Sequence, residues 1–350
     1  MTHLWVRAES RENEERVGIL PEGVAALIEA GIKVTVEASA TRVIATADYD
    51  AAGATIAPEG SWVDAPEEAI IFGLKELPDN DLPLRHRHIM FGHAYKGQPA
   101  GQRLLARFKG GGGTLYDLEY LEDENGRRVA AFGYWAGYAG AAVSLLAYAA
   151  QKADAPCPAV TTWPSSKAMR DGVKAALNGA SASALVIGAL GRVGTGATDL
   201  CEEVGLCVTK WDMVETKHGG PFPEVLDHTL FFNCILARPG TPVFVPEDTC
   251  MAPRTLRVIG DIACDPDSDF SPIKVYDRGT SWENPVLRAC ENPPLDVMAI
   301  DNLPSLMPRE SSEDFSGQLL PHLKTLTDIG DGVWARAKAY FDEHIQKVTT

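Results

Sequence analysis

The sequence predicts an α/β protein built from two doubly wound domains, and three observations support this. Its 350 residues exceed what one average hydrophobic core serves and suit two domains. Short apolar runs alternate with segments of helical spacing through residues 1–130. Further along, residues 183–212 read as strand, glycine turn, helix and strand in direct succession.

The segment 183–212 has the order of a dinucleotide-binding unit. The apolar run Ala184–Ile187 leads into a glycine turn, GALGRVGTG at 188–196, which opens a helix that ends near Gly205. A second strand, Leu206–Trp211, stops at Asp212, about twenty residues beyond the turn. Its carboxylate would accept hydrogen bonds from a ribose 2′-OH, which favours NAD over NADP.

The glycines of this turn have distinct physical roles. Gly191 lets the backbone approach a pyrophosphate, and Gly194 lets the helix pack closely on its strand. The helix N-terminus then offers free N–H groups to the anion. Ala189 stands where G-x-G-x-x-G has its first glycine, so a purely structural strand-to-helix turn stays the alternative.

The first region should form its own doubly wound sheet. We expect strands at Leu4–Arg7, Ile32–Glu37, Ala69–Leu74, His88–Ala94 and Thr114–Leu121, and helices from Pro21 to a stop at Gly31, at Asp48–Ala52 and at Gly101–Lys109. Asn125-Gly126 predicts a hairpin turn with two positive φ angles, after which Arg128–Phe132 returns as a strand.

The rest of the chain, from residue 134 on, repeats the alternation of strands and helices. Helices are expected at Tyr134–Lys152, Lys167–Leu177, Pro308–Leu320 and Val333–Lys347, and strands at Thr229–Ile235, Leu256–Ile262 and Val297–Ile300. We therefore predict a substrate domain from residues 1–133 plus about 321–350, and an NAD-binding domain from residues 134–320.

Composition excludes several classes of protein. The net charge of -16 argues against nucleic acid as a general partner. No stretch has the length and apolar character of a membrane span, and the N-terminus lacks a signal-peptide pattern, so we expect a cytoplasmic protein. The seven dispersed cysteines, without a C-x-x-C pair, are typical of reduced thiols.

Two residues with acid–base chemistry follow apolar runs of the first region. Lys75-Glu76 and His93 should lie at one edge of the sheet, where both can exchange protons if the lysine pKa is lowered. Neighbouring cations lower such a pKa and also bind carboxylates. The available cations are Arg16, Lys96, Arg127 and Arg128. This pattern suggests NAD-linked chemistry on an acidic metabolite.

Each of these residues also has a simpler interpretation. Lys75 can be a solvated lysine at a strand end, and His93 a structural histidine in an apolar setting. Arg127 and Arg128 can merely solvate a hairpin, and Asp301 can cap a loop. Two further histidines, His86 and His88, have no acidic or cysteine partner at metal-binding spacing, so no metal site is expected.

Six segments resemble a known family, the NAD-dependent, lysine-forming saccharopine dehydrogenases. They read FGLKELP at 72–78, FGHAYKGQ at 91–98, GTLYDLEYLEDENGRRVAAFG at 113–133, GALGRVGTGA at 188–197, KWDMVETKHGGPF at 210–222 and AIDNLPSLMPRE at 299–310. The resemblance spans nearly the whole chain. It implies two Rossmann-like domains flanking a central cleft, within a wider group that includes alanine dehydrogenase and transhydrogenase.

The resemblance also implies a reaction and its residues. Saccharopine, NAD and water would give lysine, 2-oxoglutarate and NADH, in lysine biosynthesis or breakdown, with Lys75 and His93 as the acid–base pair. Positions that match the substrate pocket are Arg16, Glu76, Lys96, Glu119, Arg128 and Phe132. Positions that match the cofactor site are Arg127, Gly191, Arg192, Asp212, Thr216, Cys234, Asp261, Ile300, Asp301, Asn302 and Leu303. Such relatives are often monomers, and we expect a monomer here.

Two other functions stay open from the sequence. An alanine dehydrogenase-like or other opine-forming enzyme would use a different amine and oxo acid. A non-catalytic NAD-binding metabolite sensor would need the cations but no acid–base pair, so Lys75 and His93 count against it.

Overall fold

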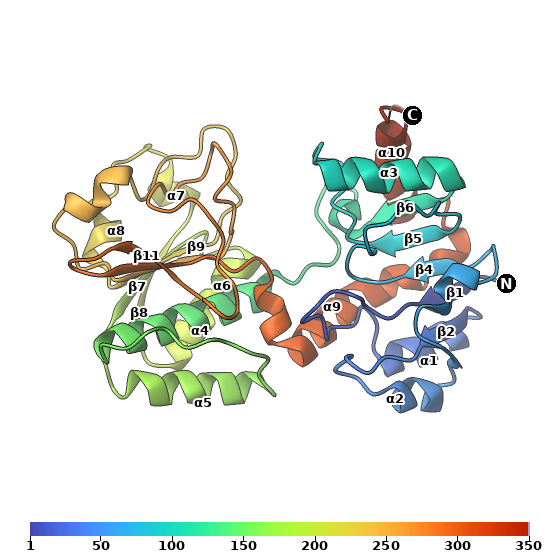
Figure 1. Cartoon of the computed structure of the whole chain (residues 1–350), viewed down its shortest axis with the longest axis horizontal. Helices are drawn as coiled ribbons and strands as arrows, with labels where there is room; N and C mark the ends of the chain where they lie inside the picture. The colour runs from blue at the N-terminus through green and yellow to red at the C-terminus, as the bar shows by residue number, and fades with distance from the viewer. Residues whose placement is uncertain (349–350) are drawn as a thin grey trace. The chain divides into compact units, whose positions relative to one another are not determined.

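The computed structural model describes residues 1–348 and divides the chain into two compact units (Figure 1). The first unit comprises Met1–Ala131 and Ser311–Thr350, and the second comprises Phe132–Glu310. The division falls inside helix α9, Pro308–Leu323. Each unit is organised around its own six-stranded sheet.

The first unit contains a parallel sheet in the order β3-β2-β1-β4-β5-β6, the strand order of a dinucleotide-binding fold. Its strands are β1 His3–Val6, β2 Lys33–Glu37, β3 Thr55–Ala57, β4 Ile70–Phe72, β5 Arg87–Met90 and β6 Thr114–Asp117. Its helices include α1 Pro21–Glu29, α2 Thr46–Ala51, α3 Pro99–Gly111 and α10 Gly332–Ile345. No helix lies between β4 and β5, which are joined by an irregular connection.

The second unit contains a sheet in the order β11-β12-β10-β9-β7-β8, parallel except for the edge strand β11. Its strands are β7 Ser183–Ile187, β8 Cys207–Trp211, β9 Leu230–Asn233, β10 Val258–Asp261, β11 Leu287–Cys290 and β12 Leu295–Met298. Its α-helices are α4 Gly133–Lys152, α5 Ser166–Leu177, α6 Arg192–Glu203, α7 Met213–Thr216 and α8 Pro223–Asp227.

Strand β7 shows why the sheet of the second unit is covered on both faces. Ala184 and Val186 join one hydrophobic cluster with α4 and α5, whereas Leu185 and Ile187 join the cluster on the opposite face. Successive side chains of a strand point to opposite faces, so a strand buried on both sides reads as a continuous apolar run.

Glycines let α4 and α6 pack closely. A Cβ on Gly137 of α4 would lie 1.8 Å from the Val193 carbonyl oxygen, and one on Gly196 of α6 would lie 1.9 Å from the Tyr134 carbonyl oxygen. Only residues without a side chain allow the two helices to approach this far. Among residues 1–348, no helix is long and apolar enough to cross a membrane.

The predicted α/β class with two mostly parallel sheets is confirmed. Strands β3 and β11 were not expected from the sequence. The predicted return strand at Arg128–Phe132 is wrong, because the chain forms one antiparallel bridge, Glu122 to Arg128, before α4 begins. In the preceding turn only Gly126 has a positive φ, of 71°, so the expected two-residue turn is also wrong.

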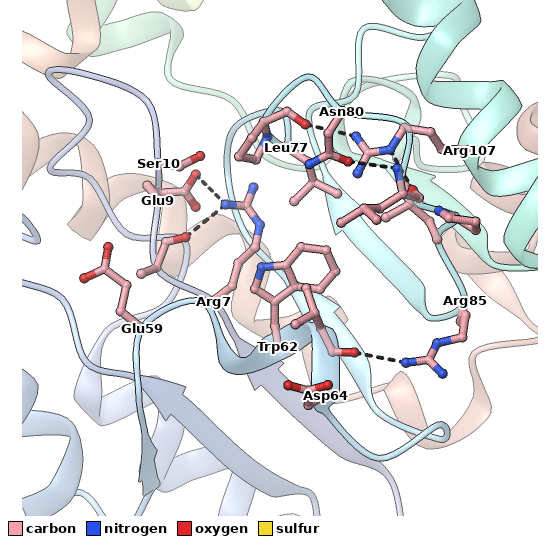
Figure 2. Close-up of a pocket in the computed structure, with 17 residues that line it drawn as sticks. Arg7, Glu9, Ser10, Glu59, Trp62, Asp64, Leu77, Asn80, Arg85 and Arg107 are labelled. Atoms are coloured by element: carbon pink, nitrogen blue, oxygen red, sulfur yellow. Dashed lines mark hydrogen bonds and ion pairs between the residues drawn. The ribbon is translucent and has the colours of Figure 1, made fainter.

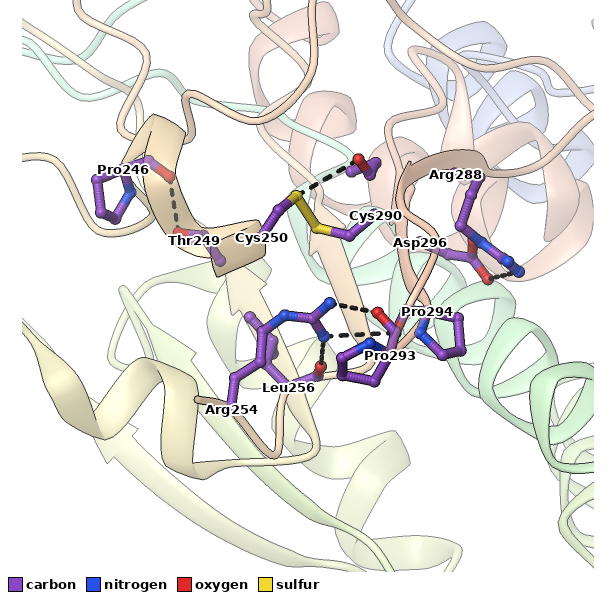
Figure 3. The surroundings of a disulfide bond; sticks show 11 residues. Pro246, Thr249, Cys250, Arg254, Leu256, Arg288, Cys290, Pro293, Pro294 and Asp296 are labelled. Carbon is purple, nitrogen blue, oxygen red and sulfur yellow. Dashed lines mark hydrogen bonds and ion pairs between the residues drawn. A yellow bond between two sulfur atoms is a disulfide. The ribbon is translucent and has the colours of Figure 1, made fainter. Parts of the chain in front are cut away.

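The expectation that all cysteines are reduced is wrong as well. Cys250 and Cys290 form a disulfide across 40 residues, with their Cα atoms 5.6 Å apart (Figure 3). It joins the 3₁₀ helix Glu247–Met251 to the edge strand β11. Arg254 supports the same corner by donating to the carbonyl oxygens of Pro293 and Leu256. Sequence spacing carries no trace of this pair, because the contact depends on how the loop folds back onto the sheet.

Candidate active site

Lys75 and His93 follow neighbouring strands of the first unit. β4 and β5 are paired in parallel, with Phe72 opposite Ile89. The pairing continues beyond both strands, because Phe91 N–H donates to the Leu74 carbonyl at 2.9 Å. The two residues therefore leave the sheet at the same carboxyl-terminal edge, where ligands lie in open parallel sheets.

His93 is held in an unusual backbone conformation. Its φ is 47°, in the left-handed region that few non-glycine residues occupy. The imidazole Nδ1 lies 3.3 Å from Glu119 Oε2, and the side chain is 46% exposed. A carboxylate at Nδ1 favours the tautomer with the proton on Nδ1, which leaves Nε2 available for proton exchange. The positive φ and this contact together fix the direction of the ring.

Glu119 is the centre of a charged cluster. Lys96 Nζ lies 3.0 Å from its Oε1, and Arg128 Nη2 lies 3.4 Å from the same oxygen. Arg128 Nε also donates to the Glu119 carbonyl at 3.1 Å. The close approach of the His93 imidazole, then the hydrogen bond from Lys96 and the charges of Lys96 and Arg128, lower the pKa of Glu119 to about 2. Glu119 therefore stays ionised at neutral pH and keeps the three basic side chains together.

Lys75 lies in a setting that disfavours its charged form. Burial lowers the pKa of its amine, and the positive charges of Arg16 and Arg11 lower this pKa further. Glu14 and Glu76 act in the opposite direction but do not cancel the effect. A larger fraction of the amine is thus neutral near physiological pH than in a solvated lysine, as a general base requires.

Arg16 is buried and paired. Its Nε and Nη2 donate to the two carboxylate oxygens of Glu14 at 2.8 and 2.6 Å, and both side chains are at most 2% exposed. Arg16 is the main cause that lowers the pKa of Glu14, against the effect of burial. Glu14 thus orients a guanidinium that the sequence proposed for substrate binding, and the sequence alone did not identify this partner.

Two other contacts were also missed. Arg11 Nη1 lies 3.5 Å from Glu76 Oε1, at the residue after Lys75. Asp117, the last residue of β6, is fully buried, and burial raises its pKa to about 6. Its carboxylate accepts the Glu119 N–H at 2.9 Å. The D-L-E spacing of Asp117 and Glu119 at a strand end was the available signal for a joint role.

The glycine turn of the second unit has the geometry expected of a dinucleotide site. Gly188 has a φ of 87°, and Gly191 is the N-cap of α6, a helix of 12 residues. A Cβ on Gly194 would lie 2.1 Å from the Gly188 carbonyl oxygen, so glycine is required there. At Gly191 a Cβ would meet only the Gly188 carbonyl oxygen, at 3.4 Å, so in the described structure this position has room for a methyl group. Free N–H groups of the first helical turn suit an anion, so the residues present fit a pyrophosphate.

Asp212 follows β8 and contacts the glycine turn. Its Oδ2 accepts the Leu190 N–H at 3.2 Å, and its Oδ1 accepts the Met213 N–H at 2.8 Å. Glu215 Oε2 accepts the Asp212 N–H at 2.8 Å, which completes a capping box on α7. The carboxylate is therefore fixed beside the turn, within the second unit.

The other predicted cofactor residues occupy varied positions. Asp261 ends β10, is 1% exposed, and accepts hydrogen bonds from Asn233 at 2.9 Å and Tyr276 at 2.6 Å. Burial raises its pKa and also that of the Cys234 thiol, next to the end of β9. The remaining residues lie at the end of α7 (Thr216), on α6 (Arg192), and after β12 (Ile300, Asp301, Asn302 and Leu303).

Two predicted residues fall on either side of the unit boundary. Arg127 lies in the first unit, in the turn where its N–H donates to Asp123 Oδ1 at 2.9 Å. Phe132 is the N-cap of α4 and the first residue of the second unit. Among the described residues no group of acidic, histidine or cysteine side chains has the arrangement of a metal site.

Comparison with known proteins shows the family. The alanine dehydrogenase/PNT N-terminal domain matches residues 5–139. A saccharopine dehydrogenase (NAD(+), L-lysine-forming) of Schizosaccharomyces pombe is 43% identical over 99% of this chain and 99% of the relative. The chain belongs to the saccharopine dehydrogenase family. A second member, from Neurospora crassa, is 45% identical over 98% of this chain and 96% of its own length.

The family assignment made from six sequence segments is thereby confirmed. Among solved structures, an L-alanine dehydrogenase superposes with a TM-score of 0.69 at 18% identity, covering 99% of both chains. That likeness concerns the fold, and it agrees with the two-domain Rossmann-like architecture expected of the saccharopine dehydrogenase family.

Proposed function

We propose that this protein catalyses the reversible, NAD-dependent conversion of saccharopine to L-lysine and 2-oxoglutarate. The observation that carries the proposal is the cluster at the carboxyl-terminal edge of the first sheet. There a half-buried lysine of lowered pKa and an imidazole beside Glu119 follow adjacent strands, among cations. The named activity of relatives similar over their full length supports the same reaction.

Lys75 is proposed as the base that removes the proton from the secondary amine of saccharopine. Its lowered pKa provides a neutral amine near physiological pH. His93 is proposed for the later steps, in which water adds to the imine and the resulting carbinolamine collapses. Its Nε2 can exchange protons because Glu119 engages Nδ1.

The cations account for the substrate's charge. Saccharopine carries three carboxylates, and Arg16, Lys96 and Arg128 are proposed to bind them. Glu76, Glu119 and Phe132 are the other residues proposed to bind the substrate. Lys96 and Arg128 share a single carboxylate, that of Glu119, in the described structure. Each retains donors that can bind a substrate carboxylate.

We propose NAD as the cofactor, bound by the second unit. When bound, it accepts a hydride from the carbon that carries the secondary amine. The backbone at Gly191 and the N-terminus of α6 would hold the pyrophosphate, and Asp212 the ribose. The further proposed contacts are Arg127, Arg192, Thr216, Cys234, Asp261, Ile300, Asp301, Asn302 and Leu303. The first unit is then the substrate domain.

The test follows NADH absorbance with different amines and oxo acids. Lysine plus 2-oxoglutarate should give turnover, and omission of either should abolish it. Absence of turnover at millimolar substrate would reject the proposal. Turnover with pyruvate and ammonia but not with lysine would indicate an alanine dehydrogenase-like enzyme. Binding of NADH without any turnover would indicate a sensor.

A further inference from the structure

The inference concerns the point in the first sheet where the strand order reverses. β1 and β4 lie side by side, but β1 continues to β2 on one side and β4 to β5 on the other. The segments that follow β1 and β4 therefore diverge as they leave the sheet. In open parallel sheets a ligand commonly occupies the crevice at this point.

In this protein two buried side chains, those of Arg7 and Glu9, occupy the crevice. Both follow β1 and are 2% and 9% exposed. Arg7 Nη1 lies 3.2 Å from Glu9 Oε2 and also donates to the Ala8 carbonyl at 3.1 Å. The pair lies in the wall of a cavity of about 580 Å³. Figure 2 shows both side chains among the residues that line it.

The pair binds the backbone of the residue proposed as the base. Glu9 accepts the Leu74 N–H at 2.6 Å and the Lys75 N–H at 3.0 Å, and Arg7 Nη2 donates to the Lys75 carbonyl. On the opposite side the chain is still paired with β5, through Gly73 N–H to Ile89 at 3.0 Å. Without Arg7 and Glu9, these partly buried peptide groups would lose their protein partners. We call Arg7 and Glu9 together the Lys75 clamp.

Gly73 makes room for the clamp. A Cβ at this position would lie 2.4 Å from Arg7 Nε and 2.5 Å from Arg7 Cζ. The guanidinium therefore crosses directly over the end of β4, and a Cβ at this position would displace it. Because both the N–H and the carbonyl of Lys75 are held, the backbone angles of this residue and the direction of its Cα–Cβ bond are set.

We propose that Arg7 and Glu9 are positioning residues, which hold Lys75 at the place where it removes the substrate's proton. This inference rests on the role proposed above for Lys75. A lysine side chain has four rotatable bonds, so an unanchored backbone would spread its amine over many positions. A displacement of about 1 Å can lower a rate by about 10²-fold.

Arg107 provides a matched control. It is also a buried arginine, 8% exposed, and it binds the same connection between β4 and β5. Its Nε donates to the Leu82 carbonyl at 3.0 Å and its Nη1 to the Pro78 carbonyl at 3.1 Å. It makes no hydrogen bond to the Lys75 peptide in the described structure. Removal of Arg107 should thus loosen the connection without releasing Lys75.

The experiment compares kcat and KM for saccharopine, the KM for NAD, and Tm in Glu9→Gln, Arg7→Met and Arg107→Met. For Glu9→Gln and Arg7→Met we expect kcat to fall about 10²-fold, with the KM for NAD within about twofold. Arg107→Met should keep kcat within about threefold of the unchanged protein, even if its Tm falls as far as that of Glu9→Gln or Arg7→Met. Glu9→Gln preserves the shape of the side chain, so it serves if Arg7→Met does not fold.

A double variant tests whether the clamp acts through Lys75. In a Lys75→Met background, Glu9→Gln should lower kcat no further, because the group it positions is gone. Three results would reject the positioning role of Arg7 and Glu9 while leaving the role of Lys75 intact. They are an unchanged kcat in Glu9→Gln, an equal fall of kcat in Arg107→Met, and additive losses of kcat in the double variant. If Lys75→Met itself keeps full turnover, the proposed base is wrong, and the clamp's role falls with it.

Discussion

The two sheets carry their candidate functional groups in opposite ways. At the edge of the first, the groups are side chains: His93, Lys96 and Arg128 converge on the carboxylate of Glu119. At the edge of the second, they are mostly backbone, exposed by the glycines of the turn at 188–196. Proton transfer needs groups with tuned pKa values, whereas a pyrophosphate needs N–H donors and space. The contrast separates residues that set rate from residues that set cofactor affinity.

The largest expected effect separates these two functions. Lys75→Met combined with His93→Gln should lower turnover of saccharopine by about 10³-fold, because both proton-transfer groups are lost. The dissociation constant of NADH should stay near that of the unchanged protein, measured by fluorescence titration. A large loss of NADH affinity would show that these residues serve the structure instead.

The second largest effect tests whether the backbone of the glycine turn, at the edge of the second sheet, binds the cofactor. Gly194→Ala should lower the free energy of unfolding by about 2–3 kcal/mol and weaken NADH at least about tenfold, because a Cβ there collides with the Gly188 carbonyl. Gly191→Ala is the matched variant, since its φ of -79° suits alanine and its Cβ has space.

For Gly191→Ala we expect a free energy of unfolding within about 0.5 kcal/mol of that of the unchanged protein. NADH should bind more weakly, because the new methyl group lies where the pyrophosphate is proposed to approach. Denaturant unfolding and NADH titration separate the two variants. Equal stability of both would contradict the packing role of Gly194.

A third prediction concerns the pH dependence of the first edge. The pKa of Glu119 is lowered to about 2 from an ordinary value of 4.5, chiefly by the neighbouring imidazole of His93. Its ionised form therefore stabilises the fold above pH 4.5, and this contribution is lost as pH falls towards 2. Glu119→Gln should reduce the stability difference between pH 4.5 and pH 2 by about 1–3 kcal/mol in urea unfolding.

The control for this measurement is Lys338→Met, which breaks the exposed pair of Lys338 with Asp342 on α10. An exposed pair contributes only about 0–1 kcal/mol, so its pH profile should follow that of the unchanged protein. If Glu119→Gln loses as much stability between pH 4.5 and pH 2 as the unchanged protein, another carboxylate is responsible for the loss.

The smallest effect concerns Asp212, the side chain proposed to bind the ribose at the edge of the second sheet. Asp212→Ala should weaken NADH by about fivefold and change saccharopine binding less, because the ribose loses its acceptor. Glu215→Ala removes the other half of the same capping box and should leave NADH affinity nearly unchanged. Equal losses in both variants would mean that Asp212 acts only as a helix cap.

The sequence alone determined the features that are local along the chain. The strand, glycine turn and helix at 183–203 follow from apolar runs and glycine spacing, and the structure confirms them as β7 and α6. The strand ends that carry Lys75 and His93 were found in the same way, because apolar runs and the polar residues after them are contiguous. The family followed from segments long enough to be specific.

Only the tertiary structure decided which side chains meet. Glu9 binds the peptide of Lys75, 66 residues away, and Cys250 pairs with Cys290, 40 residues away. Such contacts depend on strand order and on how loops fold back, neither of which leaves a periodic signal in the sequence. The partners that orient the candidate base therefore became visible only when β1 and β4 were seen side by side.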